Sequence, residues 1–393
     1  MITKITNGSN TFQFKYQISL HIDDLKVLEY IKRILNVGRI KMDPKNSAAV
    51  FYVTAKDELK VIVGIFTNFT LNTTKYLDFL SFAEAFTLYT KDNSRKARKG
   101  ANSLITEIIG GMNRNRKNFN MNLPNHRLKV TPYWLLGFVE GDGSFYLHTI
   151  SNILYFSVKQ KGNQTLLEAI KHFLLSADPS QSFSSPKYQP TLNPSTAVEV
   201  DHSEYIKINL DKSGVNELRI SNVYFLDNVL IPFFDVLIWQ SKKYLDYCDW
   251  KALFKIIKLG YHYTPEGLAL IKGIASQMNN NRLSTSKAPK VGDRSKLLDE
   301  IEVFFKNNPS NYEIRDGRTF IKSSNRFLKN PRPVPVSIKN VLSGDILYSF
   351  ESFSSCGKFL GLSGWKVNSH VQRGTEFEFE GKLISIIKIE NKD

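Results

Sequence analysis

The sequence predicts a mixed α+β chain that contains two copies of one structural unit and a small C-terminal module. Three observations support this fold class. Short motifs recur in the same order in two parts of the chain. In both parts, segments with the alternation of a strand precede segments with the period of an amphipathic helix. Residues 336–393 then form a separate regular pattern of strands and short helices.

The internal repeat rests on three pairs of matching segments. They are Lys75–Phe79 and Lys243–Tyr247, Met112–Arg116 and Met278–Arg282, and Leu28–Lys32 and Leu167–Lys171. The offsets are 168, 166 and 139 residues, so the second copy is predicted to carry an insertion of about 28 residues. The Ser- and Pro-rich segment 176–201 is expected to be this insertion and to form a loop. Two copies on one chain predict a pseudo-dimer, in which the copies pair within a single chain, so the protein is expected to be a monomer.

Each copy is predicted to contain strands and helices. Residues 14–22 and 154–161 alternate as strands with one exposed face do. Each leads into an apolar helical stripe, at residues 25–35 and 166–174. Both stripes are explained by core packing, and no chemistry is assigned to them.

The charge of the chain predicts a polyanionic partner. Fifty-three Lys and Arg residues against 37 Asp and Glu give a formal net charge of +16. Half of this excess lies in residues 91–129. Basic side chains that neutralise phosphates release condensed counterions, which favours binding to nucleic acid. The alternative is a basic protein without such a partner.

Composition also limits the other classes of function. Cys248 and Cys356 are the two cysteines, so neither a disulfide framework nor a Cys-based zinc site is expected. A metal would then be a hard cation held by carboxylates. No apolar run approaches the roughly 20 residues of a membrane span, so we expect no membrane association. Residues 1–10 resemble neither a signal nor a transit peptide, while abundant Phe, Tyr, Lys, Asn and Ile indicate an AT-rich genome.

One segment combines small residues with acidic ones. Residues 134–142 are predicted to form a short apolar helix in which Gly137 and Gly141 share a face. Small residues at this spacing allow two helix backbones to approach closely. Asp142 lies at the helix end, where the helix dipole disfavours a carboxylate unless a cation offsets it. Gly143 is a natural C-cap. A buried helix with a solvated acidic end is the alternative interpretation.

Residues 135–143, LLGFVEGDG, resemble the signature of the LAGLIDADG homing endonucleases, and the resemblance covers about residues 12–283. It implies an αββαββα unit used twice, with the two motif helices packed at a pseudo-twofold axis. It also implies a saddle of strands in the major groove of double-stranded DNA, and hydrolysis of phosphodiesters with Mg²⁺.

The resemblance also implies roles for individual residues. Asp142 is the expected metal-binding carboxylate, with the backbone carbonyl of Gly141 beside it. Lys243 resembles the active-site lysine, and Gln160 a residue that positions water; a solvated lysine and a groove-facing glutamine are the alternatives. Basic residues of the strands and repeat motifs are expected to contact DNA: Lys159, Lys161, Lys75, Arg114 and Arg116.

The first copy departs from the family pattern. Its motif should lie at about residues −4 to 4, and the segment MITK does not match it. His21 is taken as the counterpart of Gln160 at the offset of 139. Three explanations stay open: a fragment of a longer product, a misassigned start, or loss of cleavage with binding retained.

The C-terminal third is predicted to divide into a linker and a module. We expect the first copy at 1–130, the second at 131–283, a basic linker with one helix (296–306) at 284–335, and the module at 336–393. Two helices near 352–360 and 364–372 suggest a helix-turn-helix. The module resembles nuclease-associated modular DNA-binding domains, which implies DNA contacts by Trp365, Lys366, Asn368, Ser369 and Arg373. A small interaction module with Trp365 in its core is the alternative.

The leading functional hypothesis is a site-specific DNA endonuclease encoded by a mobile intron and acting in the mitochondrion. The alternatives are an RNA maturase that helps a group I intron to fold during mRNA processing, and a DNA-binding remnant that does not cut.

Overall fold

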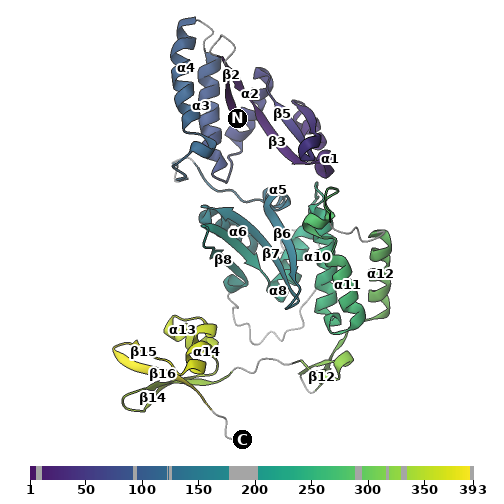
Figure 1. Ribbon diagram of the computed structural model, residues 1–393, viewed down its shortest axis with the longest axis vertical. Helices are drawn as coiled ribbons and strands as arrows, with labels where there is room; N and C mark the ends of the chain where they lie inside the picture. The colour runs from purple at the N-terminus through teal and green to yellow at the C-terminus, as the bar shows by residue number, and fades with distance from the viewer. Residues whose placement is uncertain are drawn as a thin grey trace. The chain divides into compact units, whose positions relative to one another are not determined.

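The computed structural model describes residues 1–5, 11–91, 95–121, 123, 126–176, 202–287, 294–315, 318–328 and 334–389. The chain divides into two compact units, Met1–Asn311 and Tyr312–Asp393 (Figure 1). The first unit holds both copies of the repeat. The predicted insertion lies almost entirely outside the described residues, since 177–201 are not among them. Within the described ranges, no helix is long and apolar enough to cross a membrane.

The second copy has the predicted αββαββα order. Its elements are α5 (Pro132–Asp142), β6 (Gly143–His148), β7 (Ile153–Lys161), α6 (Gln164–Ser176), β8 (Ile206–Leu210), β9 (Val215–Ile220), α8 (Val223–Phe225), a π-helical turn (Leu226–Leu230), α9 (Ile231–Asp235), α10 (Lys243–Lys258) and α11 (Pro265–Ala275). The strands form an antiparallel sheet in the order β6-β7-β9-β8. One face carries alternate apolar side chains that pack with α5, α6 and α10 around Phe145, Phe156 and Trp250.

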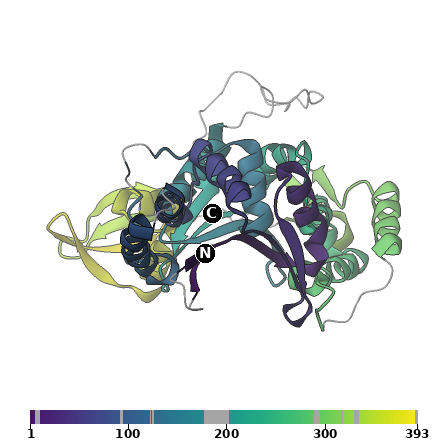
Figure 2. The same ribbon diagram turned by 90° about the horizontal axis from the view of Figure 1, so that it is seen from above.

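Among the residues that the structure describes, no helix of the first copy corresponds to α5. Its elements are β1 (Ile2–Ile5), β2 (Thr11–Phe14), β3 (Tyr16–His21), α1 (Leu25–Leu35), β4 (Arg39–Asp43), β5 (Ala48–Val53), α2 (Lys56–Asn68), α3 (Lys75–Lys91) and α4 (Arg95–Gly110). The main sheet has the order β3-β5-β4, and β1 and β2 pair separately. The strand predicted at 14–22 is therefore interrupted at Lys15. Helix α1 covers one face of the main sheet (Figures 1 and 2).

The matching motifs of the two copies form the same local structure. In the first copy, the Asp78 carboxylate accepts hydrogen bonds from the backbone N–H of Asn113 and from Arg116 Nε, both at 2.9 Å. In the second copy, Asp246 accepts from Asn279 N–H at 2.9 Å and from Arg282 Nε at 2.7 Å. Both asparagines have a φ of 56°, a left-handed conformation that asparagine tolerates better than most residues. The repeated sequence therefore forms the same hydrogen-bonded contact between the start of a helix and a turn in both copies. We call this contact of Asp78 with Arg116, and of Asp246 with Arg282, the motif lock.

The register of the sheets corrects the predicted counterpart of Gln160. Ile18 pairs with Phe51 in the first copy, and Val158 pairs with Leu218 in the second. Tyr16, Ile18 and Leu20 pack on the core of the first copy, as Leu154, Phe156 and Val158 do in the second. This alternation requires an even offset between β3 and β7, so Ile18 matches Val158 at 140 rather than 139. Leu20, and not His21, then corresponds to Gln160. One additional residue between β3 and α1 causes the change, and a slip of one residue moves a side chain to the opposite face of a sheet.

The boundary of the second copy differs from the predicted one. Helix α12 (Arg294–Asn307) packs on the core of the second copy through Ile301, Phe304 and Phe305. Asn311 donates its backbone N–H to the carbonyl of Leu259 at 2.9 Å. The segment predicted as a linker therefore begins with a helix that belongs to the first unit. It continues in the second unit as a small sheet, β10 (Tyr312–Arg315), β11 (Arg318–Ile321) and β12 (Arg326–Phe327).

The C-terminal module contains the predicted helix pair within a sheet. Its elements are β13 (Val336–Asn340), β14 (Ile346–Phe350), α13 (Phe353–Leu360), α14 (Gly364–Arg373), β15 (Glu376–Phe379) and β16 (Lys382–Lys388), with the strand order β14-β13-β16-β15. Ser352 caps α13 and Ser363 caps α14. A Cβ at Gly357 would lie 2.5 Å from the carbonyl oxygen of Leu362, so only glycine allows this close turn. The module has its own core, formed by Val336, Ile338, Cys356, Val367, Ile384 and Ile386.

Short 3₁₀ turns connect many of these elements. They span Ile22–Asp24, Pro44–Asn46, Asn113–Asn115, His202–Tyr205, Tyr261–Tyr263, Asn279–Arg282 and Lys322–Ser324.

Candidate active site

Helix α5 ends at the carboxylate that the sequence identified. Thr131 caps the helix by accepting the N–H of Trp134 at 3.3 Å, and Pro132 occupies its first turn. Gly143 is the C-cap, as predicted, but its φ is −76° and not left-handed. A Cβ at Gly143 would lie 2.6 Å from the carbonyl oxygen of Val139. Glycine is therefore required by close packing, which lets β6 begin directly after Asp142.

Asp142 and Gln160 lie together. Gln160 Nε2 donates a hydrogen bond to Asp142 Oδ2 at 2.8 Å, which joins the end of α5 to the end of β7. Asp142 is exposed and Gln160 is half-buried. The amide engages one carboxylate oxygen and leaves Oδ1 accessible. The two residues predicted to act together therefore share one site.

The donor set at Asp142 fits a hard cation that is shared with a ligand. Within the described residues, no group of three or more His, Cys, Asp or Glu side chains is placed to hold a metal ion. Mg²⁺ commonly binds through one or two carboxylates together with substrate phosphates and water. A single exposed carboxylate at the end of α5 meets that requirement when a phosphate supplies further oxygens.

The glycine face of α5 has no partner in the described chain. A Cβ built on Gly137 or Gly141 meets no atom within 4 Å, so the predicted close approach of a second helix is not observed. The first copy instead has a largely apolar cavity of about 370 Å³, lined in part by Phe79 and Phe82. Their counterparts in the second copy, Tyr247 and Trp250, pack in the core that includes α5.

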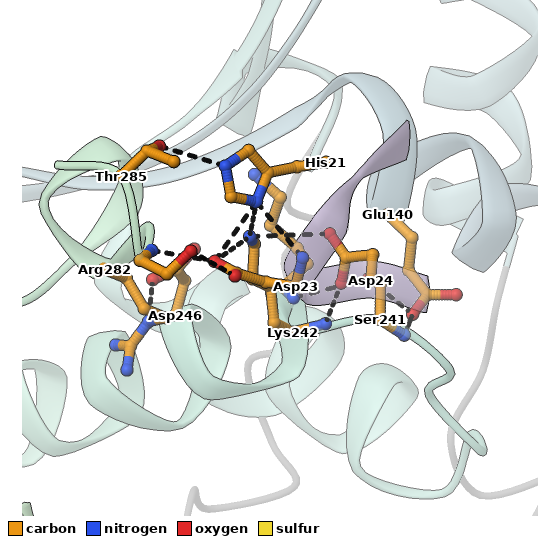
Figure 3. Close-up of polar contacts among 11 residues, drawn as sticks. His21, Asp23, Asp24, Glu140, Ser241, Lys242, Asp246, Arg282 and Thr285 are labelled. Atoms are coloured by element: carbon orange, nitrogen blue, oxygen red, sulfur yellow. Dashed lines mark hydrogen bonds and ion pairs between the residues drawn. The ribbon is translucent and has the colours of Figure 1, made fainter. Parts of the chain in front are cut away.

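Lys243 is the first residue of α10, and its side chain is half-buried. Neither an ion pair nor a side-chain hydrogen bond engages Lys243 within the part of the chain that the structure describes. The preceding Lys242 is held by residues of the first copy (Figure 3). Its Nζ lies 3.0 Å from Asp23 Oδ2, 3.7 Å from Asp24 Oδ2 and 3.3 Å from His21 Nδ1.

The junction between the copies carries a strongly hydrogen-bonded carboxylate. Burial alone would raise the pKa of Asp23, but hydrogen bonds from Ser284 and Lys242 hold this pKa well below its usual range. The backbone N–H of Ser284 donates to Asp23 Oδ2 at 2.9 Å. His21 completes the junction through a contact of 3.0 Å between Nε2 and Thr285 Oγ1. Sequence reasoning missed this cluster, because its members lie more than 200 residues apart.

The open faces of both sheets carry basic side chains. Lys159 and Lys161 are exposed on β7, on the face opposite the core, and Lys159 lies 3.7 Å from Glu217. The same face holds Lys207 and Arg219, directly opposite each other on β8 and β9. Sequence reasoning missed these two, although alternation along β8 and β9 places them on the Lys159 face. In the first copy, the exposed Arg39 and Lys41 occupy the open face of β4.

The other predicted DNA contacts have different surroundings. Lys75 and Arg114 are exposed. Arg116 is not available for DNA, because its guanidinium binds Asp78, the Leu77 carbonyl and the Ser81 hydroxyl, with 13% of the side chain exposed. The prediction for Arg116 is corrected accordingly. The side chains of residues 92–99, part of the basic run at 91–129, lie outside the described part.

Helix α14 presents the predicted residues of the C-terminal module. Trp365 is 75% exposed and is not a core residue, which rules out the alternative interpretation of this side chain. Lys366 and Arg373 are also exposed, whereas Asn368 and Ser369 are half-buried. Val367 supplies the buried contact of the helix. Trp365, Ser369 and Arg373 recur every fourth residue and therefore share one helical face.

The fold and the site define a protein with two related copies of an α+β unit, a motif helix that ends in a carboxylate, and sheets with basic open faces. A sequence model of the LAGLIDADG endonuclease family matches residues 2–86 and 135–254, which is more than half of the chain. The chain belongs to this family.

Two relatives that are similar in sequence come from yeasts. Mitochondrial protein RF1 of Saccharomyces cerevisiae is 28% identical over 282 residues, covering 70% of this chain and 56% of that protein. The probable intron-encoded endonuclease Cox1-I1b of Schizosaccharomyces pombe is 30% identical over 187 residues, 47% of each protein. The chain spans about half the length of these curated relatives.

Solved structures share the fold over 72% of this chain. The homing endonuclease I-GzeII in complex with its DNA target has a TM-score of 0.57 and 24% identity, covering 72% of this chain and 94% of that chain. The meganuclease I-SmaMI bound to uncleavable DNA has a TM-score of 0.58 and 22% identity, covering 72% and 93%.

Proposed function

We propose that the chain is an intron-encoded homing endonuclease that hydrolyses phosphodiesters in long double-stranded DNA sites. The observation that carries the proposal is the Asp142–Gln160 contact of 2.8 Å at the end of the motif helix. It places an accessible carboxylate oxygen at the end of a sheet whose open face is basic. The relatives named as intron-encoded endonucleases and the neighbours bound to DNA support this proposal.

The residues of the site have complementary tasks in this proposal. Asp142 binds the cation, which we propose is Mg²⁺, and Gln160 holds the carboxylate and orients a water molecule beside the scissile phosphate. Lys243 contributes a positive charge that stabilises the charge developing on the phosphate. When bound, Mg²⁺ lowers the pKa of a coordinated water and screens phosphate charge.

The basic open faces support DNA as the partner. Lys207 and Arg219 lie directly opposite each other across β8 and β9. Like charges in this position repel in the free protein, and a polyanion bound between them offsets the repulsion. We propose that the chain binds DNA as a monomer, since both copies lie on one chain. The name of the Saccharomyces cerevisiae relative, a mitochondrial protein, supports action in the mitochondrion.

Cleavage of both strands requires a second carboxylate, because a two-metal site needs an acid on either side. The test is a strand-resolved cleavage assay with Mg²⁺ on a library of intronless insertion sites. This chain is compared with a version extended upstream in the reading frame. Cutting by either form supports the proposal, and cutting of the second strand by the extended form alone assigns the second acid to that extension. Binding without cutting by both forms contradicts the proposal, and a preference for structured intron RNA then indicates a maturase.

The salt dependence of binding tests the role of the open face. Lys207→Gln should reduce the slope of log K against log salt concentration by about 0.9, because each phosphate contact contributes roughly that amount. Lys60→Gln is the matched control, since Lys60 is an exposed lysine on α2 that pairs with Asp57 at 2.8 Å. Fluorescence anisotropy over a range of KCl concentrations measures both slopes. An unchanged slope for Lys207→Gln would exclude this face from the DNA contact.

A further inference from the structure

Two carboxylates, one from each copy of the repeat, meet the backbone where α10 begins (Figure 3). Glu140 Oε1 accepts the N–H of Gln240 at 2.8 Å and the N–H of Ser241 at 2.6 Å. Asp24 Oδ1 accepts the next N–H, that of Lys242, at 2.9 Å. Three consecutive N–H groups are therefore satisfied by side chains from α5 and from the start of α1. The N-terminus of a helix carries unpaired donors and a positive partial charge, which favours carboxylates there.

Ser241 links this arrangement to the first residue of the helix. Its hydroxyl donates to Glu140 Oε1 at 2.9 Å, and its oxygen accepts the backbone N–H of Lys243 at 3.3 Å. Glu140 thereby fixes Ser241, and Ser241 fixes the backbone of Lys243. Glu140 lies two residues before Asp142 on the motif helix. The same short segment thus supplies the predicted metal ligand and a support for the predicted lysine.

Lys242 and Lys243 are adjacent, but they have different surroundings. The side chain of Lys242 is 19% exposed and is engaged by Asp23 and Asp24 of the first copy. Its ion pairs hold the carboxylate of Asp24 close to the helix start. The half-buried amine of Lys243, for which the described residues provide no side-chain partner, stays available for a phosphate.

The corresponding helix of the first copy lacks such support. Lys75 is the first residue of α3, and its N–H lies 3.4 Å from Thr73 Oγ1. No carboxylate accepts from the N–H groups at the start of α3 among the residues that the structure describes. Lys75 itself is exposed. The two lysines of the repeated motif therefore differ in how firmly their backbones are held.

We propose that Asp24 and Glu140 are positioning residues for Lys243, so that placement of this lysine depends on the junction between the two copies. The proposal rests on the proposed endonuclease function. Because Lys75 has no equivalent support, the effect is confined to the strand whose scissile phosphate faces Lys243. Removing either carboxylate slows cleavage of that strand and leaves the other strand and DNA affinity unchanged.

The experiment compares Asp24→Ala, Glu140→Ala and Ser241→Ala with the wild-type sequence, using single-turnover cleavage with a separate label on each strand. Each variant is made both in this chain and in the upstream-extended form, and the two strands are compared in whichever form cuts both. Ser241→Thr keeps the hydroxyl and should restore the wild-type rate. Asp227→Ala is the matched control, since Asp227 binds Lys258 at 2.6 Å, near the far end of the same helix. Chemical acetylation of lysine amines, followed across pH by mass spectrometry, reports on Lys243 directly, with Lys75 as the internal reference.

The expected result is a fall of about 10- to 100-fold in the rate for one strand, as when the support of an active-site group is removed. The acetylation profile of Lys243 should shift while that of Lys75 does not. Equal slowing of both strands, or an unchanged Lys243 profile in all three alanine variants, would overturn the proposal. If neither the wild-type chain nor its upstream-extended form cuts DNA, the endonuclease function fails, and the acetylation profiles alone decide the positioning role. If an alanine variant unfolds, the Ser241→Ala and Ser241→Thr pair decides it.

Discussion

Replacing Asp142 with Asn is expected to reduce cleavage by on the order of 10³-fold or more while changing DNA affinity little. The amide keeps the size of the carboxylate and can still accept the hydrogen bond from Gln160, which spans 2.8 Å in the wild-type chain. It removes the negative charge that a divalent cation requires. The structure of α5 should therefore persist while the chemistry is lost.

The assay combines single-turnover cleavage with a binding titration on the same DNA. Asp57→Asn is a suitable control, because the Asp57 side chain is 91% exposed on α2 and lies away from the candidate site. Metal-dependent nicking by Asp142→Asn at the wild-type rate would contradict the assigned role. Loss of binding by Asp142→Asn would instead assign Asp142 to the DNA interface.

Much of the candidate site was predictable because it depends on local sequence. The motif helix ends at Asp142, and β7 ends near Gln160 in the same copy, so a resemblance in order and spacing predicts their proximity. The repeated KYLD motif marks the start of α3 and of α10, so Lys243 begins a helix, while its catalytic role stays a prediction. Local patterns of this kind are found again in the fold, because the helix and strand periods determine which residues share a face.

The errors have long-range or single-residue causes. His21 was matched to Gln160 because the offset of 139 was taken from the helices. One additional residue between β3 and α1 makes the offset of the strands 140 instead. Arg116 was assigned to DNA because it is basic, but its partner Asp78 is distant in sequence. The junction of Lys242 with Asp23 and Asp24 has no sequence signal, since it forms only after both copies fold. The β10–β12 sheet was missed because its strands contain only two to four residues.

The second copy is expected to lose the most stability when its motif lock is broken. Arg282 lies between two buried carboxylates: its Nε lies 2.7 Å from Asp246 Oδ1, and its Nη2 contacts Asp249. The side chains of Asp246 and Asp249 are 6% and 3% exposed. Arg282→Met removes the cation and leaves two buried negative charges side by side. The free energy of unfolding should fall by about 3–5 kcal/mol, the range found when a buried ion pair loses one partner.

Arg116→Met is the matched variant in the first copy. Arg116 pairs with one carboxylate, Asp78, whose side chain is 15% exposed. Loss of this guanidinium leaves a single, partly solvated charge and two neutral acceptors, so a cost of about 1–3 kcal/mol is expected. Urea unfolding followed by circular dichroism measures both variants. Equal losses of unfolding free energy in the two variants would show that Asp249 adds nothing to the motif lock of the second copy.

Binding of DNA by Arg116→Met separates the two roles considered for this residue. If the guanidinium serves only the lock, the folded variant should bind DNA as the wild-type chain does and retain the same salt slope. A slope reduced by about 0.9 would instead assign Arg116 to a phosphate. Arg282 occupies the equivalent position in the second copy and binds two carboxylates. The same binding measurement on Arg282→Met, made at a temperature at which this variant is folded, therefore shows whether the repeated motif serves only folding in both copies.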